Sequence, residues 1–77
     1  MPKFKQFDGF QIDVRSRDHN PPHFHVIGPD FEALVRMDTM ALMAGRIPRK
    51  ALAEAVAWAS AHRTELTDEW RRLNERD

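Results

Sequence analysis

Hydrophobic and polar residues alternate through the first half of the chain, as they do in half-buried strands. The clearest stretch is 10–15, where Phe10, Ile12 and Val14 point one way and polar residues the other. Turn signals such as Asp8-Gly9 separate these stretches. The predicted strands are, in order, 10–15, 23–27, 31–38 and a short one at 40–44, ended by Gly45. The weaker alternation over 2–7 indicates a short edge strand or a lead-in.

The second half of the chain has a helical pattern. Pro48 suits the first position of a helix, and 51–61 is apolar almost all round, which predicts a helix pressed against the sheet. A narrower apolar stripe follows. One continuous helix over 48–75 would be about 42 Å long, too long for a domain with a radius of gyration of about 11–12 Å. We therefore predict a break near 60–64 and two helices.

Strands followed by helices, with short hairpin links between the strands, are typical of the α+β class. We expect an antiparallel sheet of three to four strands followed by two C-terminal helices packed on one face. The opposite face would be open to solvent or to a partner. At 77 residues, we expect the chain (1–77) to form a single domain with a modest core.

Composition narrows the classes of function. The formal net charge is zero, which argues against non-specific nucleic-acid binding as the main activity. The sequence has no cysteine, which excludes disulfides and thiolate metal sites. No apolar run is long enough to span a membrane, and the first residues lack the apolar core of a signal peptide. We therefore expect no membrane association and a cytoplasmic location in a bacterium.

Three of the four histidines lie in one block, Asp18-His19-Asn20-Pro21-Pro22-His23-Phe24-His25-Val26. Its two prolines remove two backbone donors, which predicts a loop before the next strand. Alternation then directs Phe24 and Val26 to the core, and His23 and His25 to the open face. On that face we expect them beside side chains from neighbouring strands: Gln11, Asp13, Arg15, Glu32 and Arg36.

One hypothesis for this face is a metal site. His23 and His25 are two apart on a strand and present both rings on one side, and His19 could fold back across the prolines as a third ligand. Asp18 or Asp13 would complete the set. Imidazole ligands favour zinc or another divalent transition metal as the cofactor. The alternative is that the histidines only hydrogen-bond to their neighbours.

A second hypothesis is metal-free acid–base catalysis on a phosphodiester. His23 and His25 would share the roles of acid and base, because imidazole titrates near neutral pH. Arg15 or Arg36 would hold the phosphate. A small ribonuclease requires such a set of residues. The alternative is a solvated polar face without catalysis.

Basic residues gather at the start of the predicted first helix. These are Arg46, Arg49 and Lys50, and Ile47 rather than a capping residue precedes Pro48. The helix dipole disfavours cations at this end, so a bound anion such as a nucleic-acid phosphate would be stabilising there. The alternative is pairing with the acidic second helix, or simple solvation.

The apolar stripe of the second helix consists of Leu66, Trp70 and Leu73. Such a stripe could bind a small protein partner, or a second copy of the chain to give a homo-oligomer. Packing of the stripe within the same chain is the alternative that we favour.

The block from Asp18 to Val26 resembles the hallmark of a small bacterial family known as domain of unknown function 4160. The resemblance implies a partner protein, because members are often encoded beside another small domain and have been suggested to belong to toxin–antitoxin-like pairs. It transfers no catalytic residue and puts the emphasis on the block itself: His19, Asn20, Pro21, Pro22, His23 and His25. Later features agree, so that it spans nearly the whole chain: Gly45-Arg46-Ile47-Pro48, Ala51-Leu52, Trp58, His62-Arg63, Leu66 and Trp70.

Three functions follow from these observations. The leading hypothesis is one component of a toxin–antitoxin-like pair, which binds a protein partner, and RNA as a further candidate, through the histidine-rich face. The rival is a metal-dependent or histidine-dependent hydrolase, such as a ribonuclease. The third is a non-catalytic binding module whose histidines only stabilise the loop at the two prolines.

Overall fold

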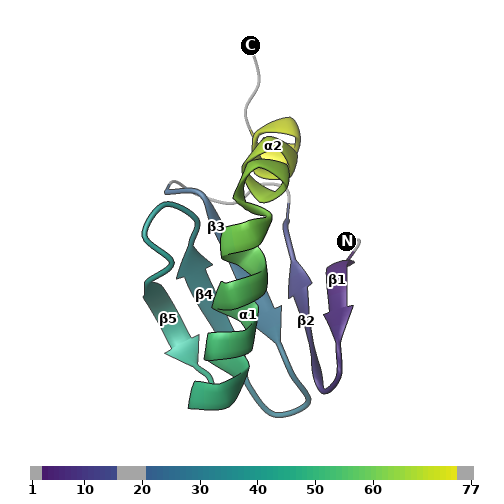
Figure 1. The fold of residues 1–77 in the computed structure, drawn as a ribbon, viewed down its shortest axis with the longest axis vertical. Helices are drawn as coiled ribbons and strands as arrows, with labels where there is room; N and C mark the ends of the chain where they lie inside the picture. Colours follow the sequence, from purple (N-terminus) through teal and green to yellow (C-terminus); the bar gives the residue numbers. More distant parts are fainter. Residues whose placement is uncertain (1–2, 16–20, 75–77) are drawn as a thin grey trace.

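A computed structural model of the chain describes residues 3–15 and 21–74, and it shows five strands followed by two helices (Figure 1). This order agrees with the predicted α+β class, but the sheet has more strands than the three to four expected. The elements are β1 Lys3–Phe7, β2 Phe10–Asp13, β3 His23–Ile27, β4 Glu32–Arg36, β5 Leu42–Arg46, α1 Arg49–Ala61 and α2 Arg63–Asn74.

The sheet is an antiparallel meander in the order β1-β2-β3-β4-β5, with β1 and β5 at its edges. The weak alternation over 2–7 has a structural cause in β1. Phe4 and Phe7 are three residues apart, yet both pack against the core, because the pairing with β2 is irregular between Lys3 and Lys5. An irregularity of this kind changes which side chains face the core. β1 is therefore a complete strand whose sequence does not alternate regularly between hydrophobic and polar residues.

Strand β5 lies further along the chain than predicted. The sequence pattern predicted a strand over 40–44 that ends at Gly45, whereas β5 continues to Arg46 and pairs Gly45 with Ala33. Gly45 has a φ of 87° and lies close against the backbone of Glu32. Because glycine adopts this conformation readily, the strand continues where a side chain would have ended it.

The core lies between the sheet and the helices, and α1 runs along one face of the sheet (Figure 1). Ala55 and Ala59 are fully buried, so the small side chains of α1 allow it to approach the strands closely. The strand residues predicted to face the helices are all buried: Phe10, Ile12, Val14, Phe24, Val26, Ala33, Val35 and Met37. The predicted alternation is confirmed for these strands.

The helical region breaks where its length required a break. α1 ends at Ala61, His62 is its C-cap, and α2 begins at Arg63. The backbone N–H of His62 donates to the carbonyl oxygens of Trp58 and Ala59, which closes the last turn of α1. Within the described part of the chain, neither helix is long and apolar enough to cross a membrane.

The apolar stripe of α2 packs inside the chain. Leu66 and Trp70 are core residues with 0% and 2% exposure, and Leu73 is partly buried against them. The hypothesis that these residues form a partner surface is therefore corrected. Burial against the sheet removes the stripe from the surface, so it corresponds to the internal packing that we favoured.

Candidate functional site

His23 and His25 lie on β3, the middle strand of the sheet, on the face turned away from α1. Their neighbours Phe24 and Val26 are fully buried on the helix side. The strand register places Asp13 of β2 directly across from His25. Strand pairing therefore gathers these polar residues on one face, as the alternation predicted.

The centre of this face is closed to solvent. His23 is 4% exposed, and His25 and Asp13 are each 5% exposed. The expectation that the histidines lie exposed on an open face is therefore wrong. Longer side chains from neighbouring positions close over the centre, because Arg15, just after β2, and Glu32 of β4 meet beside His25.

A polar network connects the side chains of this face. Gln11 donates a hydrogen bond from Nε2 to Oδ1 of Asp13 at 2.9 Å. Nη2 of Arg15 lies 3.5 Å from Oε2 of Glu32 and 4.0 Å from Oδ2 of Asp13. The same Glu32 oxygen lies 3.5 Å from Nδ1 of His25. The buried carboxylate of Asp13 thus has a hydrogen-bond donor and a cation beside it, and the ring of buried His25 has a carboxylate beside it, which offsets the cost of burying polar groups.

His23 holds the two prolines to the sheet. Its Nδ1 donates a hydrogen bond to the carbonyl oxygen of Pro21 at 2.9 Å, because a carbonyl oxygen can only accept. The backbone N–H of Met37 donates to the carbonyl oxygen of Pro22 at 3.0 Å. The rings of His23 and His25 pack with centroids 5.3 Å apart. These contacts fix the proline segment between the start of β3 and the end of β4.

Arg36 lies across from His23 in the register, but its guanidinium binds Asp38. Its Nε and Nη2 donate to the two oxygens of Asp38 at 2.8 and 2.7 Å, and Asp38 also accepts the backbone N–H of Thr39. The hydrogen bonds from Arg36 lower the pKa of Asp38 far below its usual value. The structure thus directs Arg36 to the β4–β5 turn and away from the histidines.

The predicted metal ligands divide between the described and the undescribed residues. Asp18 and His19 lie outside the described residues, while His23 and His25 provide two adjacent rings. Within residues 3–15 and 21–74, no group of three histidine, aspartate or glutamate side chains is placed to hold a metal ion. Zinc binding therefore stays a prediction that depends on His19 and Asp18.

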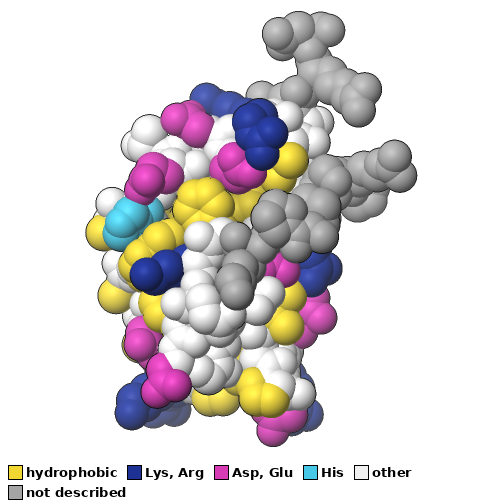
Figure 2. Space-filling view, turned by 90° about the vertical axis from the view of Figure 1, so that its right-hand side faces the viewer, with side chains coloured by type: hydrophobic (Ala, Val, Ile, Leu, Met, Phe, Trp, Pro, Cys, Tyr) yellow, Lys and Arg dark blue, Asp and Glu magenta, His cyan; other side chains and the backbone are white. Residues whose placement is uncertain are grey.

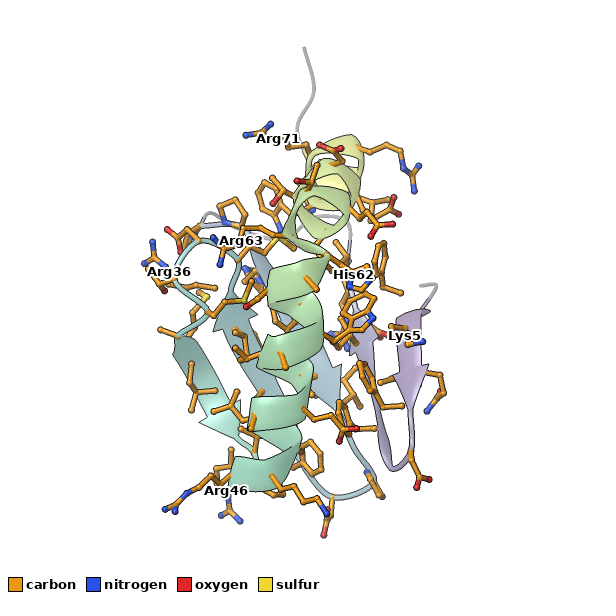
Figure 3. The ribbon with its side chains drawn as sticks, viewed as in Figure 1. Lys5, Arg36, Arg46, His62, Arg63 and Arg71 are labelled. Carbon is orange, nitrogen blue, oxygen red and sulfur yellow. The ribbon has the colours of Figure 1, made fainter. Side chains whose placement is uncertain are left out.

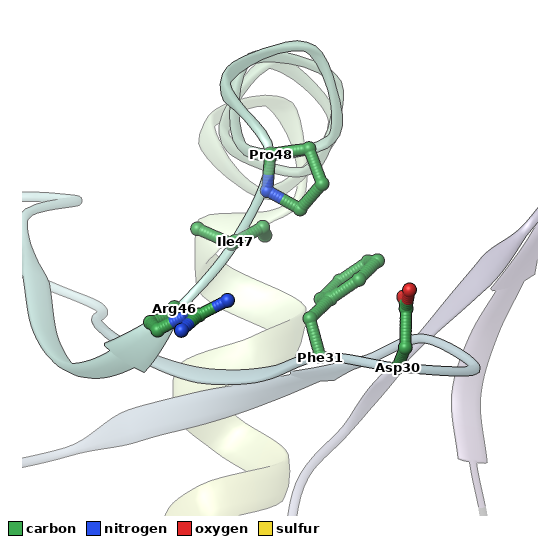
Figure 4. A pocket seen from close by; sticks show the side chains of 5 residues that line it. All are labelled: Asp30, Phe31, Arg46, Ile47 and Pro48. Atoms are coloured by element: carbon green, nitrogen blue, oxygen red, sulfur yellow. The ribbon is translucent and has the colours of Figure 1, made fainter.

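The predicted anion site at Arg46, Arg49 and Lys50 lies at the start of α1. All three residues are exposed, Pro48 is the N-cap, and the first turn of α1 has no acidic residue. Arg46 alone of the three lines a pocket of about 310 Å³, in which it and an aspartate lie on either side of a phenylalanine ring (Figure 4). This pocket therefore offers charges of both signs; it is lined by Asp30, Phe31, Arg46, Ile47 and Pro48.

Basic and acidic side chains are interspersed on the face shown in Figure 2. This mixture agrees with the zero net charge of the chain. A broad patch of one sign is the electrostatic signature of non-specific nucleic-acid binding, and this face lacks that signature.

Comparison with known proteins identifies a family. The family model described as "Domain of unknown function (DUF4160)" matches residues 9–71, which include the histidine block, the sheet from β2 onward, all of α1 and most of α2. The chain belongs to the DUF4160 family. No curated protein and no solved structure matches it. The description of the DUF4160 family supplies no activity, so the function of this domain has to be argued from its geometry.

The DUF4160 domain has an exposed edge that sequence reasoning missed. Every residue of β5 is exposed, and Leu42 and Met43 are the large hydrophobic residues with the greatest exposure, at 45% and 38%. The available signal was the uncharged run 40–45, which we had interpreted only as a short strand. The last strand of a meander lies at an edge of the sheet, and a run without charges or prolines leaves such an edge unprotected.

The DUF4160 domain also has a pocket at α2 that sequence reasoning missed. Arg63, Thr67 and Arg71 recur every four residues and line one pocket together with Pro22 and Met37. The spacing was visible in the sequence, but the contribution of Pro22, just before β3, and of Met37, just after β4, was not, because it depends on how α2 packs against the end of the sheet.

Proposed function

We propose that this DUF4160 domain is a non-catalytic protein-binding module, one component of a pair of small proteins, whose partner adds a β-strand to the edge of β5. The observation that carries the proposal is the exposure of all of β5, which begins with the hydrophobic residues Leu42 and Met43. An exposed edge presents unpaired backbone donors and acceptors, and the side chains on it supply specificity.

The composition of β5 supports recruitment of a strand. Natural edge strands that must stay unpaired carry charges or prolines along their length. From Met40 to Gly45 the chain has neither, and Arg46 provides the single charge of β5 at its end. The opposite edge, β1, has the exposed charge of Lys5 and is therefore protected in the usual way.

The charge near β5 favours a separate protein over a second copy of this chain. Antiparallel pairing of two β5 strands about Ala44 would place Arg46 of each copy opposite Leu42 of the other, which desolvates a cation against an apolar side chain. A partner strand with an acidic residue at that position would pair with Arg46 and approach Arg49. In this arrangement the exposed basic residues at the start of α1 would contribute to binding of the acidic partner strand.

The histidines support a module without catalysis. A catalytic acid or base must reach the proton that it transfers, yet His23 and His25 are buried in the sheet face. His23 instead holds the carbonyl group of Pro21, and Glu32 lies beside His25. In this proposal the histidine block stabilises the proline segment and the middle of the sheet that supports β5.

The test uses as its probe the product of a neighbouring small gene, which the resemblance to the family leads us to expect beside this chain. Light scattering should show a one-to-one complex, and hydrogen exchange should show new protection of β5 amides on binding. The double variant Leu42→Lys/Met43→Lys should weaken the complex by at least about tenfold, because lysines on an edge oppose strand addition. Lys5→Glu on the exposed part of β1 is the matched control and should leave the affinity unchanged.

Two results would overturn the proposal. An unchanged affinity in the Leu42→Lys/Met43→Lys variant would remove β5 from the interface. A dimer of the chain alone that is lost in the same variant would replace the partner by a second copy. Because both replaced side chains are exposed, we expect the variant to fold. An unchanged circular dichroism spectrum would show that any loss of affinity is not caused by unfolding.

Histidine-dependent hydrolysis of RNA is the rival function. It is favoured by the adjacent rings of His23 and His25 and by the cation of Arg15 near them. We expect purified protein to leave RNA intact, and His23→Ala to lower the free energy of unfolding by about 2 kcal/mol without abolishing partner binding. Cleavage that disappears in His23→Ala would establish the hydrolase instead. Elemental analysis of the same preparation tests the zinc prediction.

A further inference from the structure

The pocket of about 310 Å³ at the start of α1 lies where the β3–β4 turn meets the link from β5 to α1. The turn and the link both contribute to its lining, which consists of Asp30, Phe31, Arg46, Ile47 and Pro48. Figure 3 shows Arg46 at the end of the molecule where α1 begins, whereas Arg63 lies near the other end of that helix. This pocket is therefore separate from the pocket at α2.

Phe31 forms a fixed wall of this pocket. The backbone N–H of Gly28 donates to the carbonyl oxygen of Phe31 at 2.9 Å, which closes the β3–β4 turn. The ring of Phe31 lies so close to Gly28 that a Cβ atom added there would overlap it, and the ring also packs against the hydrophobic core. These contacts hold the ring in place. Phe31 therefore offers a preformed aromatic surface, which a ligand does not first have to order.

The pocket contains two opposite charges, Asp30 and Arg46. Within residues 3–15 and 21–74, neither side chain forms an ion pair or a hydrogen bond. The two do not pair with each other because they lie on either side of the ring of Phe31 (Figure 4). Glu32 lies across from Arg46 in the strand register, but its carboxylate contacts Arg15 instead. The pocket thus presents an anion and a cation that flank an aromatic ring.

This arrangement of charges determines which kind of ligand the pocket favours. A simple anion would be attracted by Arg46 and repelled by Asp30, and a simple cation would meet the reverse. A zwitterion satisfies both charges at once, with an ammonium group at one end and a carboxylate at the other. Phe31, Ile47 and Pro48 add an apolar wall, on which an aromatic side chain packs well.

We propose that this pocket binds a small zwitterion with an aromatic side chain, an α-amino acid or a dipeptide. The ammonium group contacts Asp30, the carboxylate contacts Arg46, and the aromatic ring packs on Phe31. The volume lies at the lower end of the range of about 300–1,000 Å³ for small-molecule sites, which suits one amino acid. An adjoining pocket of about 420 Å³ shares Phe31 and Pro48 and provides room for a second residue.

The test is a titration of the full chain with L-phenylalanine, followed by two-dimensional amide NMR. Shifts should concentrate around Asp30 and Arg46. N-acetylphenylalanine lacks the ammonium charge and phenylalanine amide lacks the carboxylate, so each should bind at least about threefold more weakly than phenylalanine. Glycyl-phenylalanine distinguishes the two sources of this chemistry. Tighter binding than phenylalanine assigns the pocket to a dipeptide, and equal or weaker binding assigns it to a free amino acid.

Two variants show which charge holds which end of the ligand. Asp30→Asn should weaken binding of phenylalanine by at least about threefold without weakening that of N-acetylphenylalanine, which has no ammonium group to lose contact. Arg46→Gln should weaken binding of phenylalanine to a similar extent without weakening that of phenylalanine amide. Arg49→Gln is the matched control, because Arg49 is an exposed cation near Arg46 that lines neither this pocket nor the adjoining one.

Three results would overturn the proposal: the absence of shifts with phenylalanine and the dipeptide, equal affinity for phenylalanine and its two singly charged derivatives, or binding that survives in both variants. Unchanged amide spectra of the unbound variants would show that they fold, as expected from the exposure of both replaced side chains. Asp30 lies outside β5, so Asp30→Asn should leave the affinity for the protein partner unchanged. Failure of this site is therefore distinguishable from failure of strand addition to β5.

Discussion

At the scale of a single residue, the absence of a side chain at Gly45 allows β5 to pair with β4. Its φ is 87°, and a Cβ atom there would overlap the backbone carbonyl oxygen of Glu32 and lie 2.9 Å from Cα of Ala33. Both neighbours belong to the backbone of β4 and have little freedom to move. We expect Gly45→Ala to lower the free energy of unfolding by about 3 kcal/mol, from the disfavoured conformation and the overlap together. Urea denaturation measures this loss.

Gly9 is the matched control for that substitution. Its φ is 93°, close to that of Gly45, but a Cβ atom added there would meet no other atom within 4 Å. Gly9→Ala should therefore lose only the conformational part, about 1–2 kcal/mol. Equal losses at Gly9 and Gly45 would show that overlap between a Cβ atom at position 45 and the backbone of β4 does not affect the free energy of unfolding.

At the scale of an element, α2 is held more firmly by the first residue of its apolar stripe than by the last. Leu66 has 0% exposure, whereas Leu73 is only partly buried at the edge of the core. Leu66→Ala should lower the free energy of unfolding by about 3 kcal/mol, because the buried site cannot collapse fully around the smaller side chain. Leu73→Ala should lose about 1 kcal/mol, since it removes less buried surface. Similar losses in urea denaturation would contradict the difference in packing.

The elements that sequence could predict are those whose pattern and packing agree locally. β2 and β3 alternate regularly because they pair with each other in an unbroken register. The break at His62 followed from the length of the helical region. β1 was only weakly predicted because its irregular pairing places Phe4 and Phe7 on the same side. The extent of β5 depended on a backbone approach at Gly45 that no local pattern reveals.

At the scale of the whole molecule, the candidate site depends on contacts between distant parts of the chain. The sequence placed His23 and His25 on the correct face but could not predict that they are buried. Arg15 joins Glu32 across the sheet, and Asn74 of α2 donates to the carbonyl oxygen of Arg15 at 2.8 Å, 59 residues away. Such contacts form only once the sheet and helices have packed, so local spacing contains no signal for them.

Acid stability is a property of the whole chain that two exposed pairs should influence. Arg36 lowers the pKa of Asp38, and Arg72 lowers the pKa of Glu69, both mainly through side-chain hydrogen bonds. A carboxylate with a lowered pKa in the folded state binds protons more readily when unfolded, so its stabilisation is present above its unfolded pKa of about 4 and is lost below it. The urea midpoint should fall between pH 5 and pH 2.

The double variant Asp38→Asn/Glu69→Gln should have a lower midpoint at pH 7 and a smaller fall on acidification. Because both pairs are exposed to solvent, 1 M salt should reduce the difference between the variant and the original chain at pH 7. An identical pH dependence in the two proteins would show that these carboxylates keep the same proton affinity on folding. In that case the acid sensitivity would have to come from other groups, and the polar network around Asp13 and His25 would be the next one to test.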